Sequence, residues 1–504
     1  MRAALEVFRK FYICSGLRIN LDKTKAVWIG SKAGSTDTIC PEINIQWEST
    51  FVLLGIKFNV QLHNMLEENL NSKINDIKKL LSSYGKRNIS IIGKVTIVNT
   101  LVIPKLIHVL SIIANDDDKL IKEIQKIISE FVWNRGKPRI AMLQLAQKYS
   151  DGGLQLTYLP TFIHALRISW IKRICTTYGA WQDVTKTILN EENIELIWNL
   201  DERSIKLIRN KIENPLWRDV IYAWQIYKAQ EKNESTENRS LWNTYFITNA
   251  NIIFLKTHLV NNECKYLKDI LNNNKGFITY EEFKTKFNCY NINYIDFLGL
   301  LNSIPKDWKK DLTPINKNTL IDVLNSPKVC NMTYRKIVFD QKWLFTKSEK
   351  WEIILNINLT DIEKQRIFTR PMETTVESAL RAFQYKLLNR VTVTNKFLER
   401  CKLKDTNLCS FCKTKIETIE HLFWECPRVH TLWRDLSICL WPHLDISDYL
   451  SKKMVLIGAD LSQHGTLINH ILLISKRYIY IQKCKDENLN IIHLKNVLKT
   501  KLLF

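Results

Sequence analysis

The amino-acid sequence predicts a mainly α-helical protein with a small α+β piece at its N-terminus. Apolar and polar residues alternate over short stretches of the first 60 residues, which is the pattern of strands with one wet face. After them, apolar residues recur three and four positions apart with charged residues between, which is typical of amphipathic helices. With 504 residues the chain exceeds what one hydrophobic core usually organises, so we expect about two to four domains.

The N-terminal piece is predicted to open with one helix and to continue with strands. The helix covers residues 3–14 and stops at Ser15-Gly16. Three short runs follow as expected strands: Leu17–Leu21, Ala26–Gly30 and Ile43–Trp47. A last run, Phe51–Phe58, contains Gly55, and a glycine inside a strand suggests a bulge or the close approach of another backbone.

Most of the remaining chain is predicted to be helical. The helical spacing of apolar residues is clearest in four segments: Leu66–Leu81, Leu120–Val132, Ala379–Leu388 and Leu467–Ile481. Between residues 160 and 370, isolated tryptophans at irregular spacing are expected to be core anchors rather than base-stacking platforms, because each can bury a large apolar area. The last twenty residues are expected to form a lysine-rich tail.

The chain is strongly basic. Its 73 lysines and arginines against 51 aspartates and glutamates give a net charge of +22, as expected for a partner rich in phosphates. We therefore expect RNA or DNA as a partner. Isoleucine, asparagine and lysine are all abundant and have AT-rich codons, so mutational bias is an alternative source of part of the excess.

The cysteines and the apolar segments indicate an intracellular protein, cytoplasmic or nuclear. Twelve cysteines with one tight cluster do not resemble a disulfide framework, so a reducing compartment is expected. The first residues lack the apolar run of a signal peptide. The most apolar segment, Ile91–Ala114, is interrupted by Lys94, Pro104 and Lys105, so no membrane span is expected.

Four residues near the C-terminus have the spacing of a zinc site. Cys409, Cys412, His421 and Cys426 form a Cys-x2-Cys-x8-His-x4-Cys pattern. Since such a shell of four is closed, one structural Zn²⁺ is predicted. His430, four residues after Cys426, also has acceptable spacing and is the alternative to His421. The competing interpretation is a pair of buried thiols with two histidines on the helix surface.

Three consecutive acids, Asp116-Asp-Asp118, raise the question of a polymerase site, because two-metal nucleotidyl transfer needs paired carboxylates. They come just before the helix predicted from Leu120, where acids satisfy free backbone amides and the helix dipole. No strand-forming residues frame them on both sides. The context therefore favours helix capping.

Basic residues accompany the helix that precedes the zinc pattern. Seven cations could line a phosphate-facing surface: Arg381, Lys386, Arg390, Lys396, Arg400, Lys402 and Lys404. The alternative is a solvated helix face with no ligand. The sequence does not decide between the two.

Several motifs together resemble the C-terminal part of non-LTR, LINE-type retrotransposon reverse transcriptases. The segment Phe11–Thr24, with Ser15-Gly-Leu-x-Ile-Asn20, followed by Phe51–Phe58, resembles the closing palm motifs. Downstream matches resemble the thumb and its continuation: Lys86–Val95, Pro104-Lys-Leu, Phe131-Val-Trp-Asn134 and Gly152-Gly-Leu154. Leu380–Arg390 and Glu420–Pro427 resemble the reverse-transcriptase zinc-binding domain.

The resemblance implies a domain order and a set of nucleic-acid contacts. It implies a truncated palm (1–60), thumb helices (61–150), a helical connector (151–370), a zinc-binding domain (371–484) and a basic tail (485–504). It places Lys23 near the phosphates of the incoming nucleotide and Leu54-Gly55-Ile56 at the primer end. The expected nucleic-acid contacts near the zinc module are Arg381, Lys386, Arg390 and Lys396.

The chain departs from the family in its catalytic carboxylates. In the family these aspartates lie on palm strands before the Ser-Gly-Leu-x-Ile-Asn segment, and fifteen residues precede Gly16 here. We therefore expect no Mg²⁺ site and no polymerase activity, with binding of RNA or DNA as the retained property. Two alternatives stay open: a longer, active RNA-directed DNA polymerase whose start lies upstream, and a domesticated adaptor that binds proteins.

Overall fold

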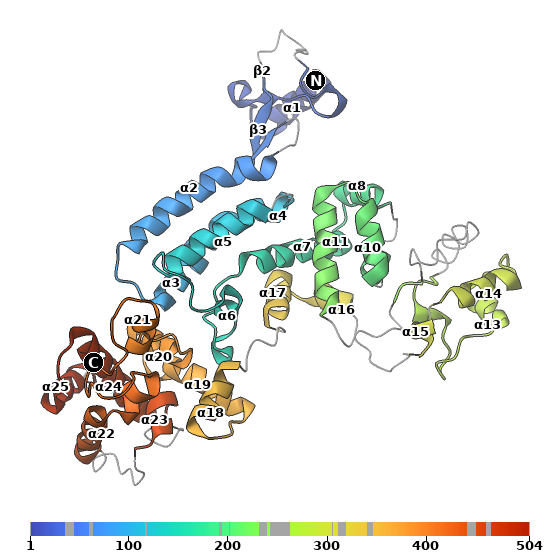
Figure 1. Ribbon diagram of the computed structural model, residues 1–504. Coiled ribbons are helices and arrows are strands. Elements are labelled where there is room, and N and C mark those ends of the chain that lie inside the picture. Colours follow the sequence, from blue (N-terminus) through green and yellow to red (C-terminus); the bar gives the residue numbers. More distant parts are fainter. Residues whose placement is uncertain are drawn as a thin grey trace. The chain divides into compact units, whose positions relative to one another are not determined.

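Figure 1 shows the computed structural model of the chain. It describes residues 2–35, 45–59, 64–115, 118–190, 194–200, 202–230, 239–241, 263–304, 306–310, 319–339, 346–440, 450–459 and 465–502. Contacts divide the chain into two units: Met1–Leu80, Pro104–Ile124 and Ile163–Asn331 form the first, and Leu81–Ile103, Gln125–Phe162 and Met332–Phe504 the second. The domain boundaries at 60, 150, 370 and 484 stay predictions.

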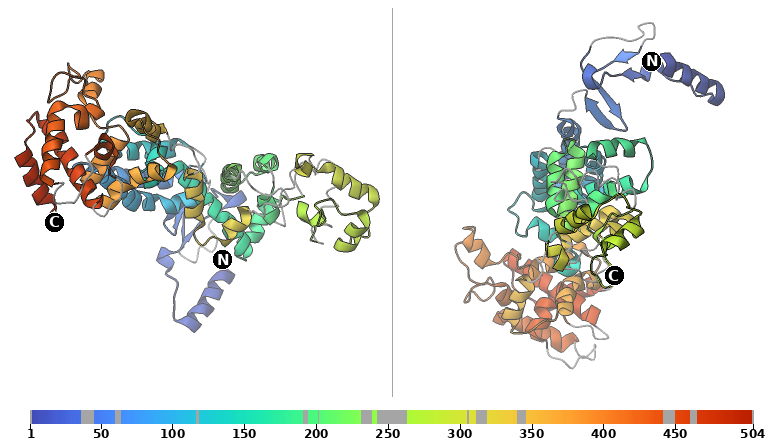
Figure 2. Two further views of the ribbon diagram at one scale, coloured as in Figure 1. Left: turned by 90° about the horizontal axis from the view of Figure 1, so that it is seen from below. Right: turned by 90° about the vertical axis from the view of Figure 1, so that its right-hand side faces the viewer.

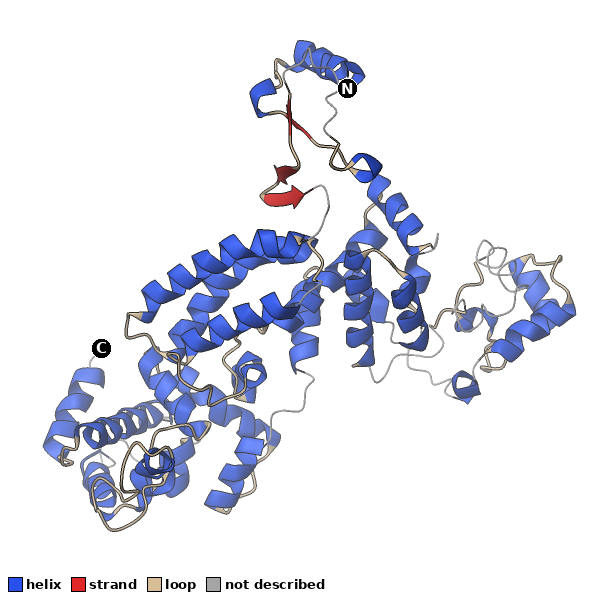
Figure 3. Ribbon diagram, turned by 45° about the horizontal axis from the view of Figure 1, so that its top comes forward, coloured by secondary structure: helices blue, strands red, loops and turns tan. Residues whose placement is uncertain are grey.

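The structure is mainly helical, as the sequence predicts. Among the described residues, strands occur only in the first 59, and helices make up most of the rest (Figure 3). The opening helix α1 (Arg2–Ser15) ends where predicted, because Gly16 takes a left-handed backbone conformation with φ of 74°.

The strands of the N-terminal piece are shorter than expected. Strands β1 (Lys25–Ala26) and β2 (Gln46–Trp47) form a parallel pair, and Trp28 stacks on Trp47. The strand predicted over Leu17–Leu21 is wrong: Leu21 begins a 3₁₀ turn, η1 (Leu21–Lys23), because the Asn20 side chain accepts the Lys23 backbone N–H. Residues 43–44 of the third predicted strand lie outside the described residues.

Gly55 lies in a hairpin turn and not in a bulge. Strands β3 (Thr50–Leu53) and β4 (Ile56–Asn59) pair antiparallel, and Phe51 stacks on Phe58 across them. Leu54 and Gly55 both have positive φ, 49° and 79°, which is the requirement of a two-residue hairpin turn. The sequence pattern therefore located the special backbone but misjudged its type.

The first unit continues with helices. They are the part of α2 (Met65–Gly85) up to Leu80, most of α4 (Ile103–Ile112), the first turns of α5 (Asp118–Val132), most of α7 (Leu159–Thr176), α8 (Ala180–Leu189), α9 (Ile194–Trp198), α10 (Glu202–Lys211), α11 (Pro215–Ala229), α13 (Tyr280–Phe287), α14 (Tyr294–Ser303), α15 (Lys306–Lys310) and α16 (Thr319–Asn325). Trp198 and Trp224 are fully buried and meet edge to face, and Trp224 Nε1 donates to the Trp198 carbonyl. These tryptophans are core anchors, as predicted.

The second unit is built around a core that runs from Trp351 to Leu498. Its helices are α3 (Ile91–Ile97), the π-helical turn η3 (Val98–Val102), α6 (Met142–Ala146), most of α17 (Val329–Phe339), α18 (Thr346–Leu355), α19 (Asp361–Thr374), α20 (Ser378–Leu388), α21 (Asn395–Arg400), α22 (Pro427–Leu440), α23 (Lys452–Ile457), α24 (Gly465–Lys485) and α25 (Ile491–Leu502). Figures 1 and 2 show α18–α25, gold to dark red, gathered at one end of this unit.

Most of the predicted C-terminal tail forms a packed helix, α25 (Ile491–Leu502). This helix buries Leu494 and Leu498 in the same core as α24, while its lysines stay at the surface. Apolar residues at four-residue spacing in a lysine-rich segment form one buried stripe. The sequence prediction gave too much weight to charge and too little to this stripe.

Two further predictions concern apolar and acidic segments. Ile91–Ile112 is long and apolar enough to span a membrane by length and composition alone, and 39% of its most apolar window is buried inside the structure. The absence of a membrane partner stays a prediction.

Asp118 begins α5, in keeping with a capping role for the acidic run, whereas Asp116 and Asp117 lie outside the described residues.

Candidate metal centre and nucleic-acid interface

Cys409 and Cys412 lie in a tight turn that the backbone closes by itself. An isolated antiparallel bridge joins Leu408 to Ile416, and the Cys409 N–H donates to the Lys415 carbonyl at 2.8 Å. Lys413, which lies between Leu408 and Ile416, takes a left-handed conformation with φ of 56°, and this reverses the direction of the chain. The turn places both sulfurs on the same side, toward the segment that carries the next two residues of the pattern.

His421 and Cys426 are held by one turn of π-helix, η7 (His421–Glu425). The Cys426 N–H donates to the His421 carbonyl at 2.9 Å, and the Thr418 hydroxyl accepts the His421 N–H at 3.0 Å. A π turn advances five residues per hydrogen bond, so the side chains at its two ends can approach the same point. Pro427 then begins α22.

The four side chains converge at tetrahedral spacing. Their ligand atoms all lie within 4.8 Å of one another, with Cys409 Sγ 3.8 Å from Cys426 Sγ and Cys412 Sγ 3.3 Å from His421 Nε2. Zinc–sulfur bonds of about 2.3 Å at tetrahedral angles place two sulfurs about 3.8 Å apart. The donor set and the spacing therefore fit one four-coordinate zinc.

Two of the three thiols, those of Cys412 and Cys426, have lowered pKa values, which favours the thiolate that a metal binds. Burial by itself would raise the pKa of Cys412, but hydrogen bonds from the Thr414 hydroxyl and from nearby backbone amides outweigh it and lower the pKa to about 7. The Cys409 thiol lowers the pKa of Cys426 by hydrogen bonding to it, and amides at the start of α22 act in the same direction. The pKa of Cys409 is raised by that hydrogen bond and by burial.

His430, the alternative ligand, is not part of this cluster. Its side chain is exposed, and its ring meets Trp424 edge to face at 5.3 Å. His421, in contrast, is buried and faces Cys412. The geometry therefore favours His421.

The comparison with known protein families agrees with this geometry. Residues 345–433 match the family described as zinc-binding in reverse transcriptase. The chain carries a reverse-transcriptase zinc-binding domain. The Cys/His cluster lies inside the matched residues, so the cluster indicates zinc binding within that domain.

Buried polar contacts tie the zinc-binding domain to the rest of the core. Glu417, fully buried, accepts hydrogen bonds from the backbone amides of Asn395 at 2.7 Å and Ser410 at 2.9 Å. Lys483 of α24 lies 3.4 Å from Glu417 and donates to the Val393 carbonyl at 3.0 Å. The Cys409–Cys412 turn is thus joined to α21 and to α24 by one carboxylate.

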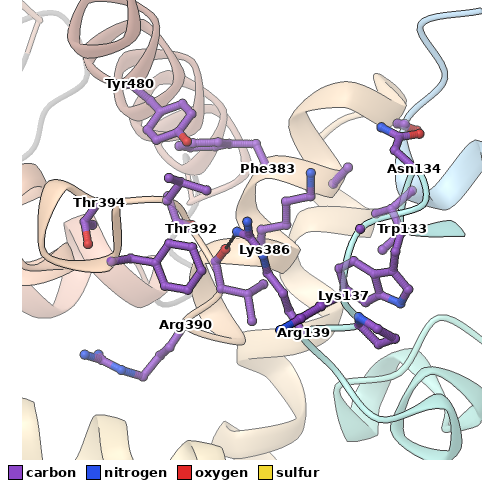
Figure 4. Close-up of a pocket in the computed structure, with 18 of the residues that line it drawn as sticks. Trp133, Asn134, Lys137, Arg139, Phe383, Lys386, Arg390, Thr392, Thr394 and Tyr480 are labelled. Atoms are coloured by element: carbon purple, nitrogen blue, oxygen red, sulfur yellow. Dashed lines mark hydrogen bonds between the residues drawn. The ribbon is translucent and has the colours of Figure 1, made fainter. Parts of the chain in front are cut away.

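A large basic pocket opens beside the zinc-binding domain, within the second unit. Its volume is about 1180 Å³, and its walls come from Asn88–Lys94, Val132–Arg139, α20 with the loop after it, α21 and α24 (Figure 4). Eight cations line it: Lys94, Lys137, Arg139, Lys386, Arg390, Lys396, Arg400 and Arg477. The described lining contains no aspartate or glutamate. We call this cavity the basic pocket.

The cations of the basic pocket repel one another. The pKa of Lys386 is lowered because the surrounding protein desolvates its ammonium and because Arg139 and Arg477 are near. The pKa of Lys94 is lowered by burial and then by the charge of Lys386. Such a group of uncompensated charges is favourable to an anionic ligand.

Three of the eight cations already have polar partners, and one of them is Arg139, which donates to the Val391 carbonyl at 3.1 Å. Lys94 donates to the Phe131 carbonyl at 2.8 Å and to the Asn134 side chain, so it caps the C-terminal end of α5. Arg390 pairs with Glu420, the residue before His421, and extends away from Lys386 and Arg139 (Figure 4). Among the described residues, Arg390 is the one lining cation that contacts a carboxylate.

The structure separates the predicted nucleic-acid contacts. Lys386, Arg390 and Lys396 line the basic pocket. Arg381 does not: its guanidinium donates to the Thr375 carbonyl and, at 2.8 Å, to the Met372 carbonyl, which fastens α20 to the end of α19. Its predicted contact with nucleic acid has no support in the geometry.

The predicted contacts of the N-terminal piece belong to the first unit. Lys23 is exposed at the end of η1, and Leu54 and Gly55 form the exposed hairpin turn, while Ile56 is buried at its base. His108 binds the Leu54 carbonyl through Nε2 at 2.8 Å. The roles of these residues near a nucleotide or a primer stay predictions.

Sequence reasoning missed half of the basic pocket. Lys94, Lys137, Arg139 and Arg477 lie on three segments, and the last is more than three hundred residues along the chain from the other two. Lys137 and Arg139 add two charges shortly after the end of the amphipathic helix α5 at Val132. That local excess of charge was the signal available in the sequence.

Proposed function

We propose that this chain is the C-terminal part of a LINE-type reverse transcriptase. In this proposal the chain binds RNA or DNA in the basic pocket, beside a domain that one zinc ion stabilises. The observation that carries the proposal is the lining of the basic pocket: eight cations and no described carboxylate, inside the unit that holds the reverse-transcriptase zinc-binding domain. Cations that converge with few counter-charges are typical of a surface that binds a phosphate backbone, and Glu420 beside Arg390 is the one carboxylate that a lining cation contacts among the described residues.

In this proposal the metal has a structural role. Cys409, Cys412, His421 and Cys426 would hold one Zn²⁺, and the closed shell leaves no position for a reacting water. The metal would fix the conformation of the segment Cys409–Cys426, which we call the knuckle. The Arg390–Glu420 and Lys483–Glu417 pairs would then hold the wall of the basic pocket in place against this ordered segment.

The polymerase chemistry of the family is not assigned to these 504 residues. Strands β1–β4 are proposed as the closing part of a palm, and none of the four carries a carboxylate side chain. The paired carboxylates that two Mg²⁺ ions need would have to come from elsewhere. We propose that this chain binds nucleic acid but does not extend a primer.

The test is the salt dependence of binding. A fluorescein-labelled oligonucleotide is titrated with the purified chain, and anisotropy gives the binding constant at several salt concentrations. Binding should weaken linearly in log–log form, with a slope of about 0.7 to 0.9 for each phosphate contacted. Undetectable binding at low salt, or binding that does not change between low and moderate salt, contradicts the proposal.

A further inference from the structure

The wall of the basic pocket contains aromatic rings as well as cations. Trp133, Phe383, Phe397 and Tyr480 line it from four separate elements, and all except Phe383 are partly exposed (Figure 4). The Arg139 guanidinium lies 4.6 Å from the Phe397 ring centre, and that of Arg477 lies 5.5 Å from the Phe383 ring centre. Aromatic rings and cations therefore lie side by side at two places in the wall.

Rings and cations select different parts of a polynucleotide. Phosphates need only positive charge, and a duplex presents them on its outside. The flat faces of bases can stack on aromatic side chains only when the bases are unpaired and unstacked from their neighbours. An electrostatic surface for a duplex does not require aromatic rings among its cations, whereas a site for a single strand does.

Two polar groups of the wall also lack a partner within the described structure. The Thr392 hydroxyl, on a residue with 7% exposure, and the Trp133 indole N–H are buried and make no hydrogen bond. Buried polar groups in native proteins are nearly always satisfied by protein, water or ligand. The edges of nucleic-acid bases carry hydrogen-bond donors and acceptors that could pair with these two groups, provided that the residues at the mouth of the basic pocket move slightly.

The size of the basic pocket fits more than one nucleotide. Its volume of about 1180 Å³ lies somewhat above the range of about 300–1,000 Å³ that suits a drug-sized ligand. Lys137, Arg139 and Lys386 line the cavity together with Trp133, and Arg139 also donates to the Val391 carbonyl at 3.1 Å. Arg477 and Tyr480, which line it as well, both belong to α24. A short run of nucleotides could place phosphates and bases on matching partners.

We infer that the basic pocket binds unpaired nucleotides, with phosphates on its cations and bases on its rings, and so prefers single-stranded nucleic acid to a duplex. The inference rests on the proposed function and names the class of ligand for the same site. Trp133 and Tyr480 are the residues assigned to base stacking, because they belong to different elements and are both partly exposed.

The first test compares four probes by anisotropy at one salt concentration. They are labelled oligothymidylate and oligouridylate of about 16 nucleotides, a mixed-sequence DNA duplex of the same length, and unlabelled inorganic polyphosphate as a competitor without bases. At least one single strand should bind about tenfold tighter than the duplex. Polyphosphate should compete weakly at equal charge.

The outcomes separate this inference from the proposed function. If the duplex binds as tightly as both single strands, or if polyphosphate competes as well as the oligonucleotides, the site recognises charge alone and the inference is overturned, while the proposed function stands. If no probe binds, both fall. A preference for RNA over DNA, or the reverse, among single strands identifies the natural source and supports the inference.

Ring variants provide the second test. Trp133→Leu and Tyr480→Leu should each weaken single-strand binding about tenfold and leave the duplex constant unchanged. Tyr178→Leu is the matched control, because Tyr178 is an exposed ring outside the basic pocket. Circular dichroism and zinc content establish that each variant is folded. Folded ring variants that keep full single-strand affinity overturn the inference.

Discussion

Glu417 and Lys483 form an ion pair 3.4 Å apart in which both side chains are almost completely removed from water. Glu417 also accepts the backbone amide of Ser410, which lies between Cys409 and Cys412. Removing one partner of such a pair leaves an uncompensated buried charge, so Glu417→Ala or Lys483→Met should lower the free energy of unfolding by about 3–5 kcal/mol. Urea unfolding followed by circular dichroism measures the change.

The control for the buried pair is an exposed one in the same unit. Lys485 and Glu487 lie 3.9 Å apart with both side chains about half exposed. Glu487→Gln should change the free energy of unfolding by less than about 0.5 kcal/mol. Equal effects of Glu417→Ala and Glu487→Gln would contradict the assignment of Glu417 as the tie between the knuckle and α24.

The zinc content of ligand variants tests the metal centre. The wild-type chain should contain one zinc, and Cys409→Ser, Cys412→Ser and His421→Ala should each lose it and loosen the knuckle, because a structural shell needs all four ligands. Elemental analysis of the purified proteins measures the zinc, and thermal melting measures the loosening. His430→Ala and Cys401→Ser, both at exposed residues outside the cluster, should keep the metal. A zinc-free wild type, or zinc lost from His430→Ala alone, would overturn the ligand set.

Local patterns in the sequence predicted the helices and the metal ligands, because each depends on residues close together in the chain. The helical period over Leu66–Leu81 corresponds to α2, and the Cys/His spacing gave the cluster that the fold brings together. The predictions of short strands failed because a strand depends on a partner elsewhere in the chain. Leu17–Leu21 has strand rhythm, but its Asn20 side chain caps a 3₁₀ turn, and a strand needs a partner that sequence does not show.

The basic pocket could not be predicted in full because it is a tertiary feature. Their position close to the zinc pattern made Lys386, Arg390 and Lys396 candidates, whereas Arg139 and Arg477 meet them only through the packing of the second unit. Arg381 shows the opposite error. It has the same helix and the same charge, but its guanidinium satisfies the carbonyls at the end of α19. The sequence gives the charge of a side chain but does not show which groups that side chain contacts in the folded protein.

The pH dependence of stability should carry the signature of Lys476. This side chain is fully buried and donates to Gln384 at 2.7 Å, and its pKa is lowered to about 7 by burial and then by the charge of Arg370. In the unfolded chain the group titrates near about 10.4. Between these pH values the unfolded state binds more protons, so stability should rise from about pH 7 toward pH 10, by up to about 1.4 kcal/mol per pH unit.

The variant Lys476→Met isolates this contribution. The difference in free energy of unfolding between wild type and Lys476→Met, measured in urea at about pH 7 and about pH 9.5, should shift in favour of the wild type as the pH rises. Lys495→Met, at an exposed lysine of α25, should show no such shift. A constant difference between wild type and Lys476→Met would contradict the buried, neutral lysine.

Primer extension tests the assignment of the chain as non-catalytic. With Mg²⁺, deoxynucleotides and a DNA primer annealed to an RNA template, the purified chain should give no extended product, because no paired carboxylates are assigned to its strands. A reverse transcriptase of known activity serves as the positive control on the same template. A ladder of extended products from the chain would restore the alternative of an active polymerase.

Nucleic-acid binding by a variant without two charges of the basic pocket tests the central claim most directly. Lys137 and Lys386 line the cavity, and neither contacts a carboxylate among the described residues. In an anisotropy titration with labelled oligothymidylate, Lys137→Ala/Lys386→Ala should weaken binding at least about tenfold and reduce the salt slope by about 1.4. Lys495→Ala/Lys499→Ala removes the same charge from the exposed face of α25 and should leave binding nearly unchanged. Equal losses in the two double variants would show that net charge, and not the basic pocket, binds the nucleic acid.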